Sequence, residues 1–340
     1  MYQDSKEMLR LISSYAGARA DYVQGGGGNT SVKFDDKLMA IKASGYTLAG
    51  ITLDVGYVTV DYQKIKRYYS TVNPLSGADF EKETLAVNMN SICLLPGMEN
   101  KRPSVEVGFH SFLKKCVIHT HSVYTNIVCC SEQGQAVADE ALADSGISYI
   151  FVPYTNPGFA STLDIKRSVD EYTVQYGQQP AAIFLENHGV IVHADDAESA
   201  IAAHEAVNEA IKAAVKPAEY PVPKIEKTAE GFKSATPELA AYMKKYGIDE
   251  QALSSLQLYP DQLVYINPKV GDTIRVSDGG IRYLTAETEA QTIEETLLGV
   301  MYVIDAINAA GLTLREMDER GAAFINNWES EKYRAQIIKK

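Results

Sequence analysis

The chain carries CVIHTH at residues 116–121 and AAIFLENHGVIVHA at residues 181–194. Both are short apolar runs rich in β-branched residues, which predicts one strand over 116–121 and two strands within 181–194. The two strands within 181–194 are separated by a polar turn, Asn187-His188-Gly189. Side chains alternate between the two faces of a strand, so His119 and His121 should share one face, with Cβ atoms about 6–7 Å apart.

The flanking segments alternate between strand and helix patterns. Strands are predicted at 38–44, 56–62 and 147–154, where apolar or alternating residues end at turn residues. Helical periodicity, capping residues and alanine-rich composition predict helices at 5–20, 104–115, 122–142, 161–177 and 197–215. The pattern indicates an α/β fold.

Composition excludes several classes of protein. The 340 residues include 46% hydrophobic and 22% charged residues, as in ordinary globular proteins. A net charge of −12 gives no general positive field, so nucleic acid and membrane surfaces are not expected partners. The four cysteines form no CxxC pair, the N-terminus lacks the features of a signal peptide, and no run of about 18–20 apolar residues occurs. We expect a cytoplasmic protein.

A change of composition divides the chain. Residues 216–228, KPAEYPVPKIEKT, hold three prolines and scattered charges, which is typical of a linker. We therefore expect a catalytic domain over 1–220 and a smaller α+β region over 229–340, called here the C-terminal region. Strands are predicted there in PDQLVYINP at 260–268 and IRVSDGGIRYLTA at 274–286, with a turn at 278–280. Helices are predicted at about 288–310 and 313–337, and the role of the region stays open.

The histidines are candidate metal ligands. Imidazole is the most common nitrogen ligand of zinc, and catalytic zinc sites usually have three protein ligands and one open position. His119, His121 and His188 together make such a set. Each also has a structural reading, as a partly buried polar residue at a strand end or as part of a turn. The remaining histidines, at 110, 193 and 204, are weaker candidates.

Glu106 is the candidate catalytic carboxylate. It is predicted in the first helical turn after Pro103-Ser104, 13 residues before His119. Beside a bound cation it could act as a ligand or as a general base. The alternative is a glutamate that only stabilises the helix N-terminus.

Three turns are candidate anion sites. The glycine block QGGGGNTSVKF at 24–34 lacks the third glycine of GxGxxG and has no GK[ST], so dinucleotide and ATP binding are not expected. Its backbone N–H groups could instead hold a phosphate or carboxylate beside Asn29. Ala43-Ser44-Gly45 and Ser104 are further turns of this kind. Taken singly, each is also explained as turn or cap chemistry.

In order, the chain contains GGGGNTS (25–31), IKASG (41–45), PSVEVGFH (103–110), VIHTH (117–121) and LENHGVIV (185–192). This series resembles the class II aldolase and adducin family over roughly residues 5–215. VPYTNPGFA at 152–160 and YPDQLVYINP at 259–268 are similar to the aldolase part of bifunctional rhamnulose-1-phosphate aldolase and alcohol dehydrogenase proteins. The resemblance implies a three-layer α/β/α sandwich around a largely antiparallel sheet, commonly in a homotetramer with sites at subunit interfaces.

The resemblance also implies a reaction. His119, His121 and His188 would hold a divalent metal, usually Zn²⁺, and Glu106 would be the acid/base, with its pKa raised by a desolvated site. The substrate would be a small phosphorylated sugar, a ketose 1-phosphate cleaved through an enediolate to dihydroxyacetone phosphate and an aldehyde. Its phosphate would be bound by Gly28, Asn29, Ser44, Gly45 and Ser104.

The chain departs from the family at two positions. Fuculose-phosphate aldolases have a second serine where this chain has Val105, and a catalytic tyrosine of some members has no clear counterpart, Tyr124 and Tyr154 being the candidates. The alternatives are a pentulose-phosphate 4-epimerase, a dehydratase or a non-catalytic adducin-like scaffold. Those epimerases carry an aspartate at the acid/base position, so Glu106 favours the aldolase, and the three histidines argue against the scaffold.

Overall fold

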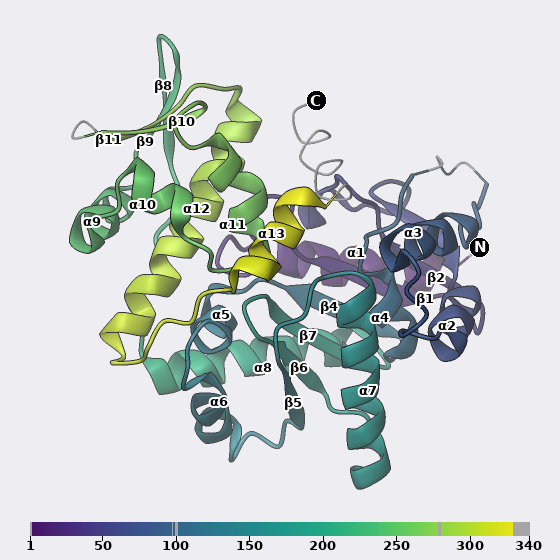
Figure 1. Ribbon diagram of the computed structural model, residues 1–340. Coiled ribbons are helices and arrows are strands. Elements are labelled where there is room, and N and C mark those ends of the chain that lie inside the picture. The colour runs from purple at the N-terminus through teal and green to yellow at the C-terminus, as the bar shows by residue number, and fades with distance from the viewer. Residues whose placement is uncertain (1, 97, 99–100, 278–279, 329–340) are drawn as a thin grey trace.

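The computed structural model describes residues 2–96, 98, 101–277 and 280–328 (Figure 1). Within these residues, seven strands form the larger of two sheets. Their order across the sheet is β3 (Tyr57–Asp61), β2 (Leu38–Lys42), β1 (Asn29–Lys33), β4 (Cys116–Thr120), β7 (Gly189–Ala194), β6 (Ala182–Leu185) and β5 (Tyr149–Val152).

Neighbouring strands of this sheet are antiparallel, except for the parallel pair β5 and β6. β4 lies at the centre, where its residue His119 pairs with Asn29 of β1 on one side and with Ile191 of β7 on the other. The predicted strands at 116–121 and within 181–194 are therefore confirmed. Their pairing brings the glycine block and the Asn187-His188-Gly189 turn to the two sides of the HxH segment.

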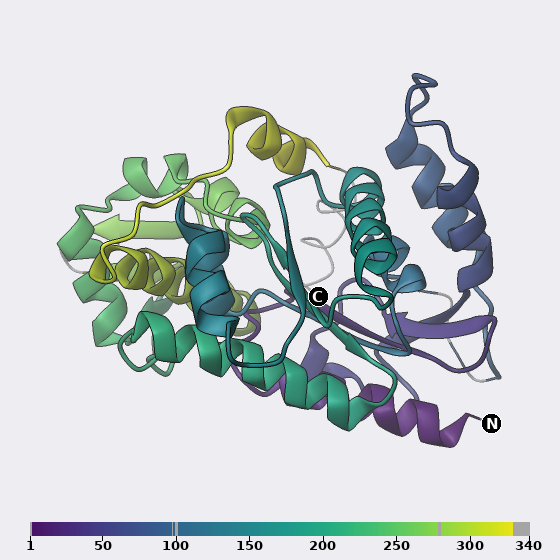
Figure 2. The ribbon, with the colours of Figure 1, turned by 90° about the horizontal axis from the view of Figure 1, so that it is seen from below.

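Helices cover both faces of the sheet, so the three-layer α/β/α architecture is confirmed (Figure 2). One layer contains α1 (Gln3–Gly17), α5 (Val123–Cys129), α6 (Gly134–Leu142) and α8 (Ala197–Val215). The other layer contains α2 (Tyr62–Thr71), α3 (Phe80–Asn90), α4 (Val107–Phe112) and α7 (Phe159–Tyr176). A 3₁₀ turn, η1 (Leu48–Gly50), follows β2.

Alternation along the strands divides the core between the two layers. In β4, Val117 packs with residues of α4 and α7, whereas Ile118 packs with residues of α1 and α8. His119 continues the Val117 face and contacts Phe109 of α4 edge-on, with ring centroids 5.7 Å apart. The central strand thus places its first histidine on the side of the sheet where Glu106 and α4 lie.

The C-terminal region adds a smaller, antiparallel sheet and a group of helices (Figure 1). The sheet order is β10 (Ile274–Ser277), β11 (Gly280–Tyr283), β9 (Gly231–Ser234) and β8 (Ile225–Thr228), and β8 lies within the predicted linker. The helical segments are α9 (Pro237–Tyr246), α10 (Glu250–Ser255), α11 (Pro260–Tyr265), η2 (Asn267–Lys269), α12 (Glu287–Ala309) and α13 (Glu319–Asn327).

One strand prediction was wrong. Residues 260–265 form helix α11, not a strand. Pro260 occupies the first helical turn, where its fixed φ and missing N–H do no harm, and every residue of α11 is buried. A short apolar run buried on all sides carries no period that separates strand from helix, so the sequence pattern could not decide between them.

Several predicted helix ends also moved. The helix after Pro103 begins only at Val107, which makes Glu106 its N-cap residue. The segment predicted as a helix over 313–337 forms α13 only from Glu319, where Asp318 accepts a hydrogen bond from the N–H of Gly321 at 2.7 Å. Its last part, and two residues of the predicted turn at 278–280, lie outside the described residues.

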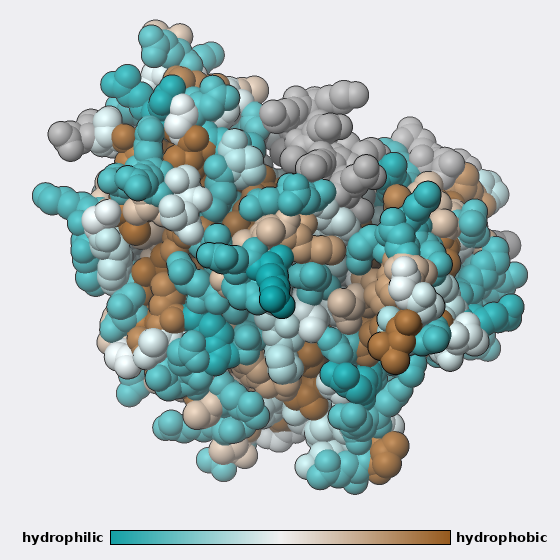
Figure 3. All heavy atoms as spheres, in the orientation of Figure 1, coloured by the Kyte–Doolittle hydropathy of each residue, from teal (hydrophilic) through white to brown (hydrophobic). Residues whose placement is uncertain are grey.

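The face shown in Figure 3 is mainly hydrophilic, with hydrophobic residues in small groups. No helix in the described part of the chain is both long and apolar enough to cross a membrane.

Candidate active site

Three histidines converge beside the centre of the large sheet. His119 lies in β4 and His121 directly follows it, and their ring centroids are 5.0 Å apart, as expected for two side chains on one face. His188 lies in the turn between β6 and β7, after Asn187, which adopts a left-handed conformation with φ 49°. One nitrogen from each of the three buried imidazoles lies within 4.8 Å of the other two. The structure therefore brings together the set that the sequence proposed.

The hydrogen bonds of two histidines define which nitrogen faces the centre of the cluster. Nδ1 of His119 donates to the carbonyl oxygen of Val190 at 3.0 Å, and Nδ1 of His121 donates to the carboxylate of Asp261. The Nε2 atoms of His119 and His121 then lie 3.2 Å apart. Since each Nδ1 carries the proton, both Nε2 atoms present lone pairs to each other.

This arrangement fits a bound cation. Burial lowers the pKa of His119 to about 4 and that of His188 to about 3, so both imidazoles are neutral at pH 7, as ligands must be. Two nitrogens bound at about 2.0–2.1 Å to a tetrahedral zinc lie about 3.3–3.4 Å from each other. The observed 3.2 Å between the two Nε2 atoms is close to that separation. Facing lone pairs without a cation would repel each other.

Glu106 lies against the cluster. Its Oε1 atom is 3.3 Å from Nε2 of His188, and its Oε2 atom is 3.5 Å from Nε2 of His119. Burial alone would raise the pKa of Glu106, as the sequence analysis expected, but the charge of the imidazoles, which they carry at low pH, and the hydrogen bond from the Asn29 amide lower it to about 2. The expectation of a raised pKa was therefore wrong, and the carboxylate is ionised at neutral pH.

Asn29 fixes the orientation of that carboxylate. Its Nδ2 donates to Oε2 of Glu106 at 2.6 Å, and its Oδ1 accepts a hydrogen bond from Nε2 of His110. Ser31 completes the chain, its Oγ lying 2.7 Å from Nδ1 of His110. Both ends of the Asn29 side chain are thus committed to holding Glu106, while its role in phosphate binding stays a prediction. The sequence analysis named His110 only as a weaker candidate metal ligand, and its contact with Asn29 was not expected.

The predicted anion-binding residues line one pocket with two of the histidines. Gly28, Asn29, Ser44, Gly45 and Ser104 surround it together with Glu106, His121 and His188. Two backbone hydrogen bonds join the separate turns: the N–H of Ser44 donates to the carbonyl of Arg102 at 2.8 Å, and the N–H of Ser104 donates to that of Lys42 at 3.0 Å. Lys42 is buried, lines the same pocket and was missed by the sequence analysis, although it stands in the IKASG motif.

Gly28 explains why the block must contain glycine at this point. Its φ is +61°, a conformation that side chains other than glycine rarely adopt. A Cβ atom there would lie 2.6 Å from the carbonyl oxygen of His119. The absence of a side chain lets the loop lie directly on the strand that carries the histidines.

The sequence profile described as Class II Aldolase and Adducin N-terminal domain matches residues 10–215. The chain belongs to this family. A curated relative, the uncharacterized oxidoreductase YuxG of Bacillus subtilis, is 28% identical over 204 residues, and the match covers 57% of this chain but only 27% of that protein.

The same fold occurs in a solved structure of the family. The N-terminal class II aldolase domain of a conserved protein from Thermoplasma acidophilum superposes with a TM-score of 0.50 at 20% identity, covering 60% of this chain and 91% of that domain. An L-fuculose-1-phosphate aldolase from Thermus thermophilus gives a TM-score of 0.37 at 14% identity, covering 63% of this chain and 94% of its own.

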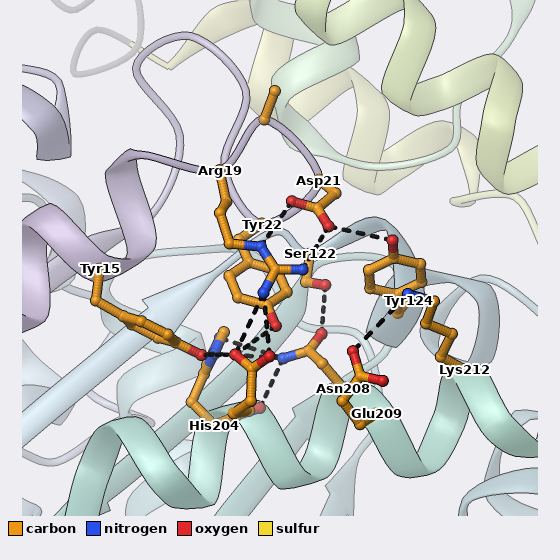
Figure 4. Close-up of polar contacts among 12 residues, drawn as sticks. Tyr15, Arg19, Asp21, Tyr22, Ser122, Tyr124, His204, Asn208, Glu209 and Lys212 are labelled. Atoms are coloured by element: carbon orange, nitrogen blue, oxygen red, sulfur yellow. Dashed lines mark hydrogen bonds and ion pairs between the residues drawn. The ribbon is translucent and has the colours of Figure 1, made fainter. Parts of the chain in front are cut away.

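Within residues 10–215, a polar network lies on the face of β4 opposite to His119 (Figure 4). Thr120 Oγ1 lies 2.7 Å from Nε2 of His204 in α8, and the hydroxyl of Tyr15 lies 3.1 Å from Nδ1 of the same ring. The hydroxyls of Tyr15 and Tyr22 both donate to Glu205, at 2.6 and 2.8 Å. These contacts tie α1, α8 and β4 together. They engage both ring nitrogens of His204, which the sequence analysis named only as a weaker candidate ligand.

The candidate tyrosines do not line the described part of the pocket. The hydroxyl of Tyr124 donates to Asp21 at 3.1 Å, within the network of Figure 4. Tyr154 packs with Leu263, Val264 and Trp328 of the C-terminal region. Asp261, by contrast, was missed. It lies outside the residues that match the family profile, and although it stands in the YPDQLVYINP motif, the sequence analysis gave it no role.

Proposed function

We propose that this chain is a metal-dependent aldolase that cleaves a ketose 1-phosphate to dihydroxyacetone phosphate and an aldehyde. The observation that carries the proposal is one pocket, lined by His121, His188, Glu106 and turns suited to an anion, with the buried His119 completing the histidine cluster. Membership of the class II aldolase and adducin family supports the same chemistry.

His119, His121 and His188 would hold the metal, and their three imidazole nitrogens suit Zn²⁺. When bound, the cation would act as a Lewis acid and stabilise negative charge on the oxygens of the substrate. Val190 and Asp261 would keep His119 and His121 in the tautomers that this binding requires.

The substrate phosphate would bind at the turns formed by Gly28, Ser44, Gly45 and Ser104. They line the same pocket as His121 and His188, so a substrate held there by its phosphate would reach these two metal ligands. The N–H groups of Ser44 and Ser104 already donate to backbone carbonyls, but the hydroxyls of both serines can donate to phosphate oxygens, and Lys42 lines the same wall. Because the pocket also contains Asn29, the phosphate and Glu106 would compete for its amide.

Glu106 would carry the proton of the reaction. When the C3–C4 bond breaks, the C4 hydroxyl loses its proton to become an aldehyde, and the carbon of the enediolate gains one. The ionised Glu106, held by Asn29, would take up a proton and deliver it to that carbon, and remove it again in the reverse direction.

The test is release of dihydroxyacetone phosphate from rhamnulose, fuculose, ribulose and xylulose 1-phosphates, by zinc-loaded and chelator-stripped protein. Metal-dependent release from one sugar supports the proposal and ranks the sugars. If protein with stoichiometric metal releases none, the aldolase proposal fails. Product analysis of the same mixtures then distinguishes a 4-epimerase from a dehydratase, and failure to bind metal favours the scaffold alternative.

We further propose that the protein is a homo-oligomer, a tetramer as is common in the family. Light scattering on the eluting protein measures its mass directly, and a monomer of 37.3 kDa would contradict this proposal.

A further inference from the structure

We propose that Asp261 of the C-terminal region is a positioning residue for His121, so that this region is part of the metal centre. The inference rests on the proposed function, because it takes the three histidines as metal ligands. It extends that function to residues that lie beyond the family match at 10–215.

The contact between the two side chains is direct and buried. Nδ1 of His121 donates to Oδ2 of Asp261, and the two residues are 3% and 0% exposed. A carboxylate can only accept, so it keeps the proton on Nδ1 and directs the Nε2 lone pair toward His119 and His188. A carboxylate in this place raises the basicity of a ligating imidazole and fixes its ring orientation.

The glycine block leaves room for this carboxylate. A Cβ atom on Gly27 would lie 2.5 Å from Oδ2 of Asp261 and 3.1 Å from Nδ1 of His121. The loop is also held from the C-terminal region, because the N–H of Gly25 donates to Oε2 of Glu295 in α12 at 2.9 Å. The close approach of Asp261 and His121 therefore explains why residue 27 is a glycine, although the block is not a nucleotide-binding motif.

The segment that carries Asp261 is itself held in place. Gln262 accepts from the N–H of Leu258 at 2.9 Å, and its Nε2 donates to the carbonyl of Leu256 at 2.6 Å. The carbonyl of Leu258 in turn accepts from Nδ2 of Asn187, the residue before His188, at 2.9 Å. The segment that carries Asp261 is thus hydrogen-bonded to the turn that carries His188. Such support fixes the position of Asp261 and with it the orientation of His121.

The experiment measures zinc affinity by competition with a chromophoric chelator, which needs no substrate. Asp261→Asn keeps one acceptor oxygen, and Asp261→Ala removes both. Asp305→Asn is the matched control in the same region, since Asp305 accepts from Lys245 and Tyr246, at 2.7 and 2.9 Å, and not from a histidine. We expect the zinc dissociation constant to rise about 10-fold in D261N and about 100-fold in D261A, and to stay unchanged in D305N.

Thermal unfolding of the metal-free variants shows whether each is folded, and D261N alone decides the question if D261A is not. If D261N and D261A bind zinc as tightly as the unchanged protein, the positioning role is overturned, while the aldolase proposal stands or falls on release of dihydroxyacetone phosphate. If the unchanged protein binds no divalent metal, both are overturned. If the affinities fall as expected but no sugar is cleaved, only the aldolase proposal fails.

Discussion

Glu106 stays ionised because its neighbours outweigh its burial. Burial alone would raise its pKa, but the imidazoles, charged at the low pH where the carboxyl titrates, and the amide of Asn29 lower it to about 2. Its position at the start of α4 was visible in the sequence, but the direction of its pKa shift was not. That shift depends on groups contributed by β1, β4 and the turn after β6.

We predict that Glu106→Gln abolishes most activity while leaving the metal in place. Glutamine keeps the shape and can still accept from Asn29, but it cannot take up a proton. The turnover number should fall about 10²–10⁴-fold, the usual contribution of a general acid or base.

Steady-state kinetics and the metal content of the same preparations check this prediction. Full activity would show that the proton is carried elsewhere. Loss of the metal together with activity would instead identify Glu106 as a fourth ligand.

At the scale of elements, the turn between β6 and β7 depends on a contact with the C-terminal region. Asn187 has φ 49°, and its Nδ2 donates to the carbonyls of Leu258 and Arg315, at 2.9 and 2.8 Å. Arg315 also pairs with Glu186 and Glu132. The sequence indicated a turn at Asn-His-Gly, and the structure shows what holds it.

Replacement of Asn187 should therefore be destabilising in two separable parts. Asn187→Gly keeps the left-handed conformation and loses the two hydrogen bonds, which should cost roughly 1–3 kcal/mol. Asn187→Ala should cost about 1–2 kcal/mol more, because alanine is strained at positive φ. Urea unfolding of both variants measures the difference, and equal stabilities would mean that the turn relaxes to another conformation.

Helix α12 is attached to the small sheet through a buried acid. Glu294 accepts hydrogen bonds from Ser234 at 2.8 Å, from Thr236 at 2.5 Å and from the hydroxyl of Tyr283. Burial outweighs these contacts and raises the pKa of Glu294 above its usual value. In the window between the unfolded and the folded pKa, the folded state binds more protons, so the contribution of Glu294 to stability falls as pH rises.

We predict that Glu294→Gln removes this part of the pH dependence. The free energy of unfolding is measured for both proteins from about pH 4 to pH 8. The value for the variant minus the value for the unchanged protein should increase as pH rises. A difference between the two proteins that stays constant over this range would show that the carboxyl titrates as it does in the unfolded chain.

For the whole molecule, one hydrophobic core joins the two parts that the linker was predicted to separate. Leu9 and Ile118 belong to the same buried cluster as Leu297 and Met301 of α12. The division into domains at 1–220 and 229–340 stays a prediction about the chain, and it does not correspond to two separate hydrophobic cores.

We predict a single thermal unfolding transition. Zinc should raise its midpoint temperature, and a chelator should lower it. A shared core couples the unfolding of both parts, and a ligand that binds only the folded state stabilises whatever unfolds together with its site. Scanning calorimetry with and without zinc tests this. Two resolved transitions, of which zinc moves only one, would contradict it.

The sequence by itself determined the elements and the set of histidines. Alternation placed His119 and His121 on one face, the Asn-His-Gly break marked the third histidine, and alanine-rich periodicity marked α8, because these patterns are local and repeat with the period of the element. The resemblance added the layered architecture. Residues 260–265 were wrongly predicted because a short run buried on all sides has no such period.

Only the tertiary structure decided which side chains complete the site. Asp261 contacts His121 across 140 residues, and His110 reaches Asn29 across 81 residues. Asp261 stands in the YPDQLVYINP motif, but nothing in that motif indicates a histidine as its partner. Its role, like the pKa of Glu106, arises from packing that removes water and leaves each buried group only the partners that the fold brings to it.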